Sequence, residues 1–288
     1  DMTRDQNLIK EHFEQIFNLA EILIQYHPED PDANTIYADF QMNKGNIYIA
    51  KLALQKVIET RKDKYGIWEQ LLQIDYQLAD WNSMIKHSNE AIENFPNIPV
   101  LYFFNGISSF QLSRYEQAKK SLDFGYKILP KNDILERDYL TFLGEVYYKL
   151  DDKPTAYSYF DKLLTVDPDN LMVMNNYSYY LSLDRTDLPK AKSMSFKTIQ
   201  KEPENATYLD TYAWILFEMH QYSEALKYIQ KAVYFDSTLS GVIIEHYGDI
   251  LYFNDDTEGA IEQWKRVKTI GNGSDKLDEK IAAGKYIE

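Results

Sequence analysis

Hydrophobic residues recur along residues 137–170 at the spacing of two amphipathic helices. The apolar and small positions of the two runs are Leu143, Gly144, Tyr147 and Tyr148, then Ala156, Phe160, Leu163 and Leu164. Between the runs, Pro154 suits the first turn of a helix, because its missing N–H is not needed there. Residues 167–170, with Pro168, end the second run. A helix pair this short cannot bury its own apolar faces, so the pattern predicts further copies.

Small residues on the second run of each unit set the period of the repetition. They fall at Ala50, Ala118, Ala156, Ala191, Ala225 and Ala260, with Met84 as the one larger residue, and successive steps are 34, 34, 38, 35, 34 and 35 residues. The longer steps place extra residues in turns, around 132–136 and 184–187, where a stack of helix pairs tolerates insertions. We therefore predict about seven repeats, at 31–64, 65–98, 99–132, 137–170, 171–205, 206–240 and 241–273.

The two ends of the chain depart from this unit. Residues 1–30 are predicted to hold a leading helix, a partial repeat without its partner helix, which suggests a chain cut from something longer. Its stripe is Ile9, Phe13, Ile16, Ala20, Leu23 and Ile24. Residues 274–288 are predicted to form a polar capping helix, since a stack of repeats needs its last apolar face covered. The apolar side of that helix is Leu277, Ile281 and Ala282, and residues 271–273 form the joint before it.

The repeat resembles the tetratricopeptide repeat (TPR) in its period and in the order of its residue types. A small residue stands on the first helix, at Gly106, Gly144, Ala213 and Gly248, an alanine follows on the second, and a proline often closes the unit. The resemblance covers nearly the whole chain. It implies an all-α, right-handed superhelical solenoid of antiparallel helix pairs, in which small residues let the helix axes approach closely.

A finer resemblance concerns residues 205–267, which look most like TPR arrays in bacterial proteins of the cell envelope. This leaves the compartment open, with the periplasm or cell envelope favoured over the cytoplasm.

Composition narrows the classes of function. Hydrophobic residues make up 44% of the chain, which is enough for an ordered core, and no apolar run reaches the length of a transmembrane helix. A net charge of −14 argues against nucleic acid as a partner, because phosphate binding needs clustered Lys and Arg. The chain has no Cys, which excludes disulfides and thiolate metal sites within it.

Candidate catalytic and metal-binding residues are few. The five His form no metal-ligand motif, and the neighbours Glu245 and His246 diverge by about 100° on a helix. Acidic residues at 151–152 and 255–256 fall in predicted turns, where capping of the next helix is favoured. General acid–base catalysis needs carboxylates in a partly dry pocket instead. Residues 271–274 lack the Lys and the spacing of a phosphate loop. We therefore predict a non-enzyme with no cofactor and no metal.

In the TPR architecture the first helix of each pair lines a concave groove, so the register assigns candidate binding residues. They are mainly aromatic, amide and acidic: Phe103, Glu145, Tyr148, Lys149, Asn175, Asn176, Tyr179, Asp210, Trp214, Phe217, Glu218, Glu245, Asp249 and Tyr252. The resemblance also suggests a clamp for a C-terminal carboxylate, but the required cations are missing, with Lys149 the one Lys in the set. The alternative for the aromatic positions is packing between neighbouring first helices as core.

These residues predict a non-catalytic protein–protein interaction scaffold or adaptor. Amides at Asn175 and Asn176 suit an extended peptide backbone, and the acids and aromatic rings suit a basic or neutral partner. Two other classes stay open: the regulatory or assembly region of a larger enzyme or envelope complex, and a binder of glycan or cell-wall fragments through the aromatics. Self-association through the leading helix is a further prediction.

Overall fold

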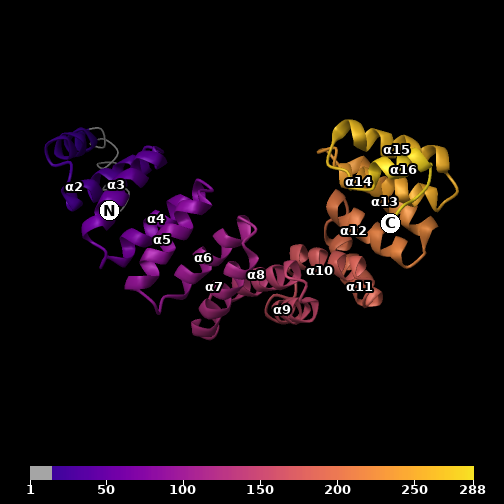
Figure 1. Ribbon diagram of the computed structural model, residues 1–288, viewed down its shortest axis with the longest axis horizontal. Coiled ribbons are helices and arrows are strands. Elements are labelled where there is room, and N and C mark those ends of the chain that lie inside the picture. Colours follow the sequence, from indigo (N-terminus) through magenta and orange to yellow (C-terminus); the bar gives the residue numbers. More distant parts are fainter. Residues whose placement is uncertain (1–14) are drawn as a thin grey trace, which may run out of the picture. The chain divides into compact units, whose positions relative to one another are not determined.

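The computed structural model describes residues 15–288, and every regular element in that range is a helix (Figure 1). Contacts divide the chain into two compact units, Asp1–Tyr159 and Phe160–Glu288. In the first unit, a helical stretch over residues 15–26 precedes α2 (Pro31–Asn43), α3 (Ile47–Thr60), α4 (Tyr65–Gln77), α5 (Trp81–Asn94), α6 (Pro99–Gln111), α7 (Tyr115–Ile128) and α8 (Glu136–Lys149). Helix α9 (Lys153–Val166) contains the division.

The second unit continues with α10 (Leu171–Leu183), α11 (Leu188–Lys201), α12 (Ala206–Glu218), α13 (Tyr222–Phe235), α14 (Gly241–Tyr252), α15 (Thr257–Ile270) and α16 (Leu277–Ala283). Consecutive helices pack as antiparallel pairs, and the first helices of neighbouring pairs also touch, as α10 does α12 and α12 does α14. The all-α, TPR-like solenoid of helix pairs that the hydrophobic pattern predicts is therefore confirmed.

The turn inside each pair has the same conformation throughout. One residue adopts a positive φ, and its N–H and the next N–H bond back to carbonyls of the preceding helix, as Asp151 does to Tyr148 and Asp152 to Tyr147. The residues with positive φ are Gly45, Ala79, Ser113, Asp151, Arg185, His220 and Asp255. The second helix starts two residues later in every case except after Arg185, where it starts three later. The predicted extra residue in that turn is present.

Side chains at residues 152 and 256 cap the helices that follow them, as the sequence predicts. The Asp256 carboxylate accepts a hydrogen bond from the Gly259 N–H at 2.9 Å, and Asp152 accepts one from Thr155 at 3.3 Å. Asn170 closes the turn after α9 by accepting from the Val173 N–H at 3.1 Å. These acids and amides satisfy helix N–H groups, which explains their place in the turns.

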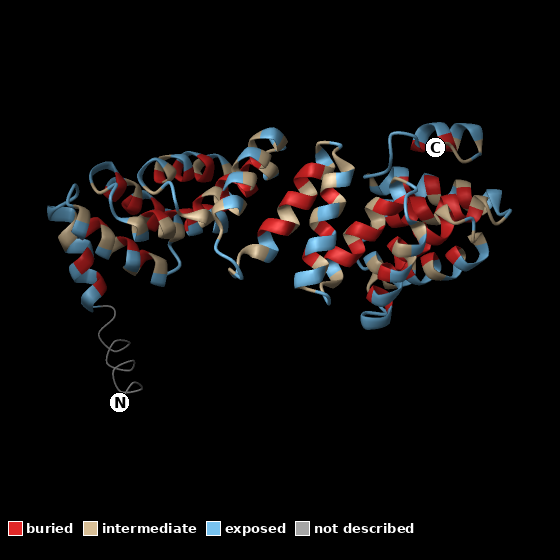
Figure 2. Cartoon of the chain, turned by 90° about the horizontal axis from the view of Figure 1, so that it is seen from below, coloured by how far each residue is buried: buried red, intermediate tan, exposed pale blue. Residues whose placement is uncertain are grey.

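The core lies between the helices of each pair, and buried positions recur along one side of each helix (Figure 2). The small residues that set the register are fully buried, as Ala118 and Ala260 show. Glycine on a first helix also makes room for a large neighbour, because a Cβ on Gly106 would lie 2.5 Å from Leu122 Cγ. Within residues 15–288, no helix combines the length and apolar character needed to cross a bilayer.

The leading helix differs in detail from its prediction. Ile9 and Phe13 lie outside the described residues, while Ile16 is 40% exposed and Phe17 is 4% exposed. The prediction that Ile16 lies on the buried face was therefore wrong, and its neighbour Phe17 takes that place. In a short helix the hydrophobic period does not decide which of two adjacent apolar residues faces the core. Leu19 is 64% exposed, and self-association through this helix stays a prediction.

The capping helix is also shorter than predicted. Helix α16 spans Leu277–Ala283 rather than residues 274–288, and it buries Leu277 as expected. Ala282 is exposed, which contradicts its predicted place on the apolar side. Lys280 takes that inward position and is 4% exposed, because buried acids on α14 receive its ammonium group.

Candidate binding groove

Two adjoining pockets open in the second unit over the first helices α10, α12 and α14. The larger, of about 580 Å³, is called here the amide pocket; the smaller, of about 360 Å³, lies toward α16 and is called the cap pocket. Both are lined by Tyr179 and Val242, so they adjoin. The other residues of the amide pocket are Asn175, Asn176, Asn205, Ala206, Thr207, Asp210, Thr211, Phe235, Asp236, Ser237, Thr238, Ser240 and Ile243.

The amide pocket holds a buried acceptor without a partner. Asn175 is 4% exposed, and its Oδ1 makes no hydrogen bond. A buried polar atom left unpaired costs free energy, so such atoms are uncommon in folded chains. None of the residues lining this pocket is Lys, Arg or His. The pocket therefore suits a ligand that brings an N–H donor.

The rim of the amide pocket is fixed by the turn between α13 and α14. The Asp236 carboxylate accepts hydrogen bonds from the N–H and Oγ1–H of Thr238 at 2.9 and 2.6 Å and from the Ser240 N–H at 2.6 Å. Partial burial raises the pKa of Asp236, but these bonds outweigh burial and hold the pKa below its ordinary value. The rim thus carries a negative charge in a set position.

The acids of α14 are paired inside the chain. Lys280 donates to Glu245 Oε1 at 2.9 Å and to Asp249 Oδ1 and Oδ2 at 2.9 and 2.8 Å. The Trp264 indole also donates to Asp249 at 2.9 Å, and the Ser274 N–H donates to Glu245 at 2.7 Å. Glu245 and Asp249 are 5% and 2% exposed. Their predicted role as charges open to a partner is corrected, because α16 supplies a cation that the register of first helices omits.

Asp210 forms a second buried pair in the same region. Its Oδ1 lies 2.9 Å from Nδ1 of His246, and the two residues are 6% and 8% exposed. Burial lowers the pKa of His246, but the charge and hydrogen bond of Asp210, with the nearby Asp249 and Glu245, outweigh burial and raise the pKa above its ordinary value. The folded chain therefore favours the protonated form of His246 more than the free side chain does.

Burial raises the pKa of Asp249 to about 6, although Lys280 and His246 both act to lower it. A raised pKa in the folded state means that the folded chain binds protons more tightly than the unfolded chain. The stabilising contribution from protonating Asp249 or His246 is therefore present at low pH and lost as the pH rises through the folded-state pKa. Glu245 has the opposite effect on stability. Burial raises its pKa, but hydrogen bonds from Ser274 and Lys280 outweigh burial and lower the pKa, so its stabilising contribution is lost as the pH falls.

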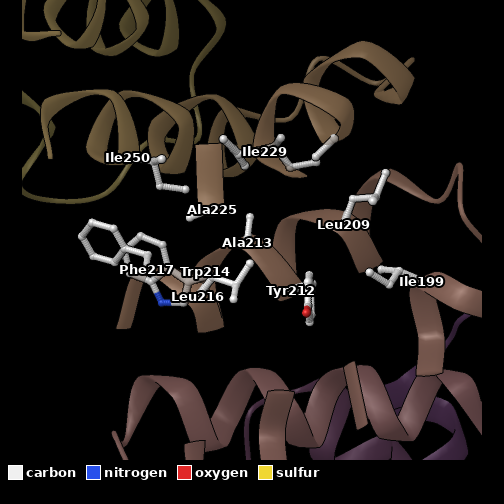
Figure 3. Packing of buried hydrophobic residues seen from close by; sticks show 12 residues of the cluster. Ile199, Leu209, Tyr212, Ala213, Trp214, Leu216, Phe217, Ala225, Ile229 and Ile250 are labelled. Atoms are coloured by element: carbon white, nitrogen blue, oxygen red, sulfur yellow. The ribbon is translucent and has the colours of Figure 1, made fainter. Parts of the chain in front are cut away.

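The aromatic residues of α12 belong mainly to the core. Trp214 and Phe217 are 7% and 5% exposed, and their rings stack at 4.7 Å between centroids (Figure 3). The Trp214 ring also stacks on His246 at 4.1 Å, and its Nε1–H has no hydrogen-bond partner. Contacts within the second unit cover most of both rings, which favours the core alternative for their faces, while Trp214 also lines the cap pocket. Tyr179 is half-buried and lies at the junction of the two pockets.

The remaining predicted residues are distributed more widely. The Glu218 carboxylate accepts a hydrogen bond from Arg185 Nε at 2.7 Å. The Tyr252 ring centroid lies 6.2 Å from that of Trp264 on α15, so Tyr252 packs toward the second helix of its pair rather than toward the groove. Asn176 is partly exposed in the wall of the amide pocket.

The predicted residues of the first unit line neither of these pockets. Phe103 is 9% exposed and packs edge-on against Tyr139 and Phe142, which is the core alternative. On α8, Glu145 and Tyr148 are half-buried and Lys149 is exposed. The structure therefore brings together the residues of α10, α12 and α14 as a candidate site.

Sequence reasoning missed the cations Lys280 and Arg185 and the ring of Tyr286. A usable indication existed for Lys280, since it stands three residues after Leu277 and next to Ile281 on the apolar stripe of the capping helix. Within residues 15–288, no cluster of three or more His, Asp and Glu side chains is arranged to hold a metal ion.

Comparisons with known proteins agree with the fold. A family model described as the tetratricopeptide repeat matches residues 138–170, which is the stretch where the repeat is clearest. No curated protein matches the chain by sequence. The match identifies residues 138–170 as similar to a tetratricopeptide repeat, and the helix pairs and their period give the rest of the described chain a TPR-like fold.

Solved structures share the fold at low sequence identity. A tetratricopeptide repeat protein from Parabacteroides merdae is 16% identical, covers 92% of this chain and 98% of its own length, and superposes with a TM-score of 0.66. YrrB, described as a TPR protein with an unusual peptide-binding site, is 16% identical over 67% of this chain and 96% of its own, with a TM-score of 0.56. MamA from Desulfovibrio magneticus RS-1 is 22% identical over 60% and 94%, with a TM-score of 0.52. This fold is in general a scaffold for protein–protein interaction.

Proposed function

We propose that this chain is a non-catalytic interaction module that binds an extended segment of a partner protein across α10, α12 and α14. The observation that carries the proposal is the unpartnered Oδ1 of Asn175 in the wall of the amide pocket. A partner that donates an N–H to this atom removes the cost of leaving it unpaired.

A peptide backbone matches the unpaired groups of both pockets. Asn175 offers an acceptor in the amide pocket, and the Trp214 Nε1–H offers a donor beside the cap pocket. Each amide of an extended chain carries one N–H and one C=O, so one segment lying along the two pockets can satisfy both. The peptide-binding site described for YrrB, which shares this fold, supports the same class of ligand.

The charges favour a neutral or weakly basic segment. Asp210, Glu245 and Asp249 already hold His246 and Lys280, so they offer little free charge. The carboxylate of Asp236 at the rim remains to attract a donor or a cation. Binding of a glycan has less support, because a sugar needs an open aromatic face and the Trp214 ring is stacked within the protein.

A displayed peptide library tests this function. The immobilised chain selects binders, whose dissociation constants are then measured for Asn175→Ala, for Asn176→Ala and for the control Asn94→Ala, which changes an exposed Asn of the first unit. One hydrogen bond contributes about 0.5–1.5 kcal/mol, so Asn175→Ala is expected to weaken binding up to about tenfold. Its melting temperature should stay near that of the parent, since the lost Oδ1 has no partner in the free chain. Peptides whose dissociation constants are unchanged by both Asn175→Ala and Asn176→Ala would refute the amide pocket as the binding site.

A further inference from the structure

Residues 285–288 lie against the C-terminal ends of α12 and α14. After α16 the chain turns at Gly284, which has φ +60°. The centroid of the Tyr286 ring lies 5.8 Å from that of Phe217 and 5.2 Å from that of Phe253. Glu288 Oε1 then lies 2.6 Å from a guanidinium nitrogen of Arg185, in the turn after α10. Residues 285–288 are called here the tail, and Phe217, Phe253, Arg185 and Glu218 are called the tail seat.

Beyond Lys285 the tail is held by its side chains. Within the part of the chain that the structure describes, residues 286–288 make no backbone–backbone hydrogen bond, and the last such bond joins the Lys285 N–H to the Lys280 carbonyl at 3.3 Å. The Glu288 side chain is 70% exposed, and exposed ion pairs contribute little to stability. Because few interactions hold it, this segment can open locally while α16 stays docked.

The tail seat is organised by contacts that do not involve the tail. Phe217 stacks on Trp214, and Phe253 stacks on Tyr222 with their ring centroids 4.8 Å apart. Arg185 is held by Glu218, whose side chain is 7% exposed, at 2.7 Å. Two rings and an oriented guanidinium are therefore in place before anything binds, which lowers the ordering cost of an incoming ligand.

We propose that the tail seat is a docking surface for a partner protein segment carrying an aromatic residue followed, two residues later, by a carboxylate, and that the tail is its resident competitor. The aromatic side chain takes the place of Tyr286 between Phe217 and Phe253, and the carboxylate takes the place of Glu288 on Arg185. This surface goes beyond the proposed function, because it uses residues other than Asn175 and the amide pocket. Occupancy by the tail reduces the apparent affinity of the partner by the fraction of chains in which the seat is open.

A synthetic peptide tests the proposal directly. The probe is a fluorescein-labelled, C-terminally amidated peptide of residues 282–288, Ala-Ala-Gly-Lys-Tyr-Ile-Glu, with matched peptides in which Tyr is replaced by Ala or Glu by Gln. Fluorescence anisotropy measures its binding to the intact chain, to a chain ending at Gly284 and to the full-length variant Tyr286→Ala. Both altered chains keep α16 and the bonds of Lys280 to Glu245 and Asp249.

The chain ending at Gly284 and Tyr286→Ala are expected to bind the probe at least about tenfold more tightly than the intact chain, which corresponds to a seat open in about a tenth of molecules or fewer. In the chain ending at Gly284, Arg185→Ala should weaken binding about two- to fivefold, while the exposed control Arg266→Ala should not. Equal affinity of all three chains for the probe overturns the proposal. The proposal is also overturned if light scattering shows that the intact chain is a dimer and that Tyr286→Ala makes it a monomer, because the tail would then bind a second copy of the chain. Asn175→Ala leaves probe binding unchanged, which separates this result from that of the proposed function.

Discussion

Replacing Lys280 with Ala is the sharpest test of how the last repeats are held. The Lys280 ammonium is 4% exposed and bonds three carboxylate oxygens of Glu245 and Asp249 at 2.8–2.9 Å. Removing one partner of a buried ion pair costs about 3–5 kcal/mol, because the charge left behind is neither hydrated nor paired. Here two acids are left behind.

Two responses limit the loss. Asp249 has a pKa raised to about 6 even beside Lys280, so without Lys280 its protonation at pH 7 costs at most about 1.4 kcal/mol. Helix α16 stands at the end of the array, so it can also detach and let water reach the acids. We therefore expect Lys280→Ala to lower the free energy of unfolding of the last repeats by about 2–4 kcal/mol at pH 7 and by less at pH 5.5.

Urea unfolding followed by circular dichroism measures the loss, and hydrogen exchange read by mass spectrometry locates it. The exchange of residues 257–288 should rise, while that of α2–α7 stays unchanged. Lys268→Ala is the matched control, since its ion pair with Asp278 at 2.6 Å is exposed and contributes about 0–1 kcal/mol. Combining Lys280→Met with Glu245→Gln and Asp249→Asn removes all three charges and should recover most of the stability. A loss below about 1 kcal/mol for Lys280→Ala would refute the reasoning.

Two further predictions follow from the pKa values and from the packing of glycine. Lowering the pH from 8 to about 5 should stabilise the second unit against urea, because the raised pKa values of Asp249 and His246 make the folded chain bind more protons than the unfolded chain. Asp249→Asn should weaken the dependence of the free energy of unfolding on pH, and the same pH dependence in this variant as in the parent contradicts the prediction. Gly106→Ala should lower the free energy of unfolding by about 1–3 kcal/mol, since its Cβ would lie 2.5 Å from Leu122 Cγ. Gly66→Ala on α4, with nothing within 4 Å of the new Cβ, should raise it by up to about 1 kcal/mol, and equal effects of the two changes count against this packing.

The repeat register could be predicted because it depends on local pattern. Ala118, Ala156 and Ala191 stand where each second helix meets its first, and all three are fully buried. The extra residue of the turn at 184–187 was also predictable, because an insertion shifts every later apolar position by one. Period and turn chemistry act over a few residues, so one sequence is enough to locate them.

The pairing of charges could not be predicted in the same way. Lys280 reaches Asp249 across 31 residues and Glu245 across 35, and the bonds join a capping helix to a first helix. The helical period places Glu245 and Asp249 on an inward face, but it does not say which side chain from another element meets them. Burial of the Trp214 ring against His246 was missed for the same reason.

These pairings change what a partner can recognise. On the register alone, the acids of α12 and α14 form a negative groove that selects a basic ligand. Glu218 has Arg185, and Glu245 and Asp249 have Lys280, as a cation within 3 Å, while Asp210 has the His246 imidazole at 2.9 Å. A ligand gains little by replacing a cation that the fold holds in place, because it pays the same desolvation for a pair of equal strength. For the partner proposed above, we therefore expect selectivity from hydrogen bonds to Asn175 and from the charge of Asp236, and both favour an extended backbone that offers N–H groups over a strongly cationic segment.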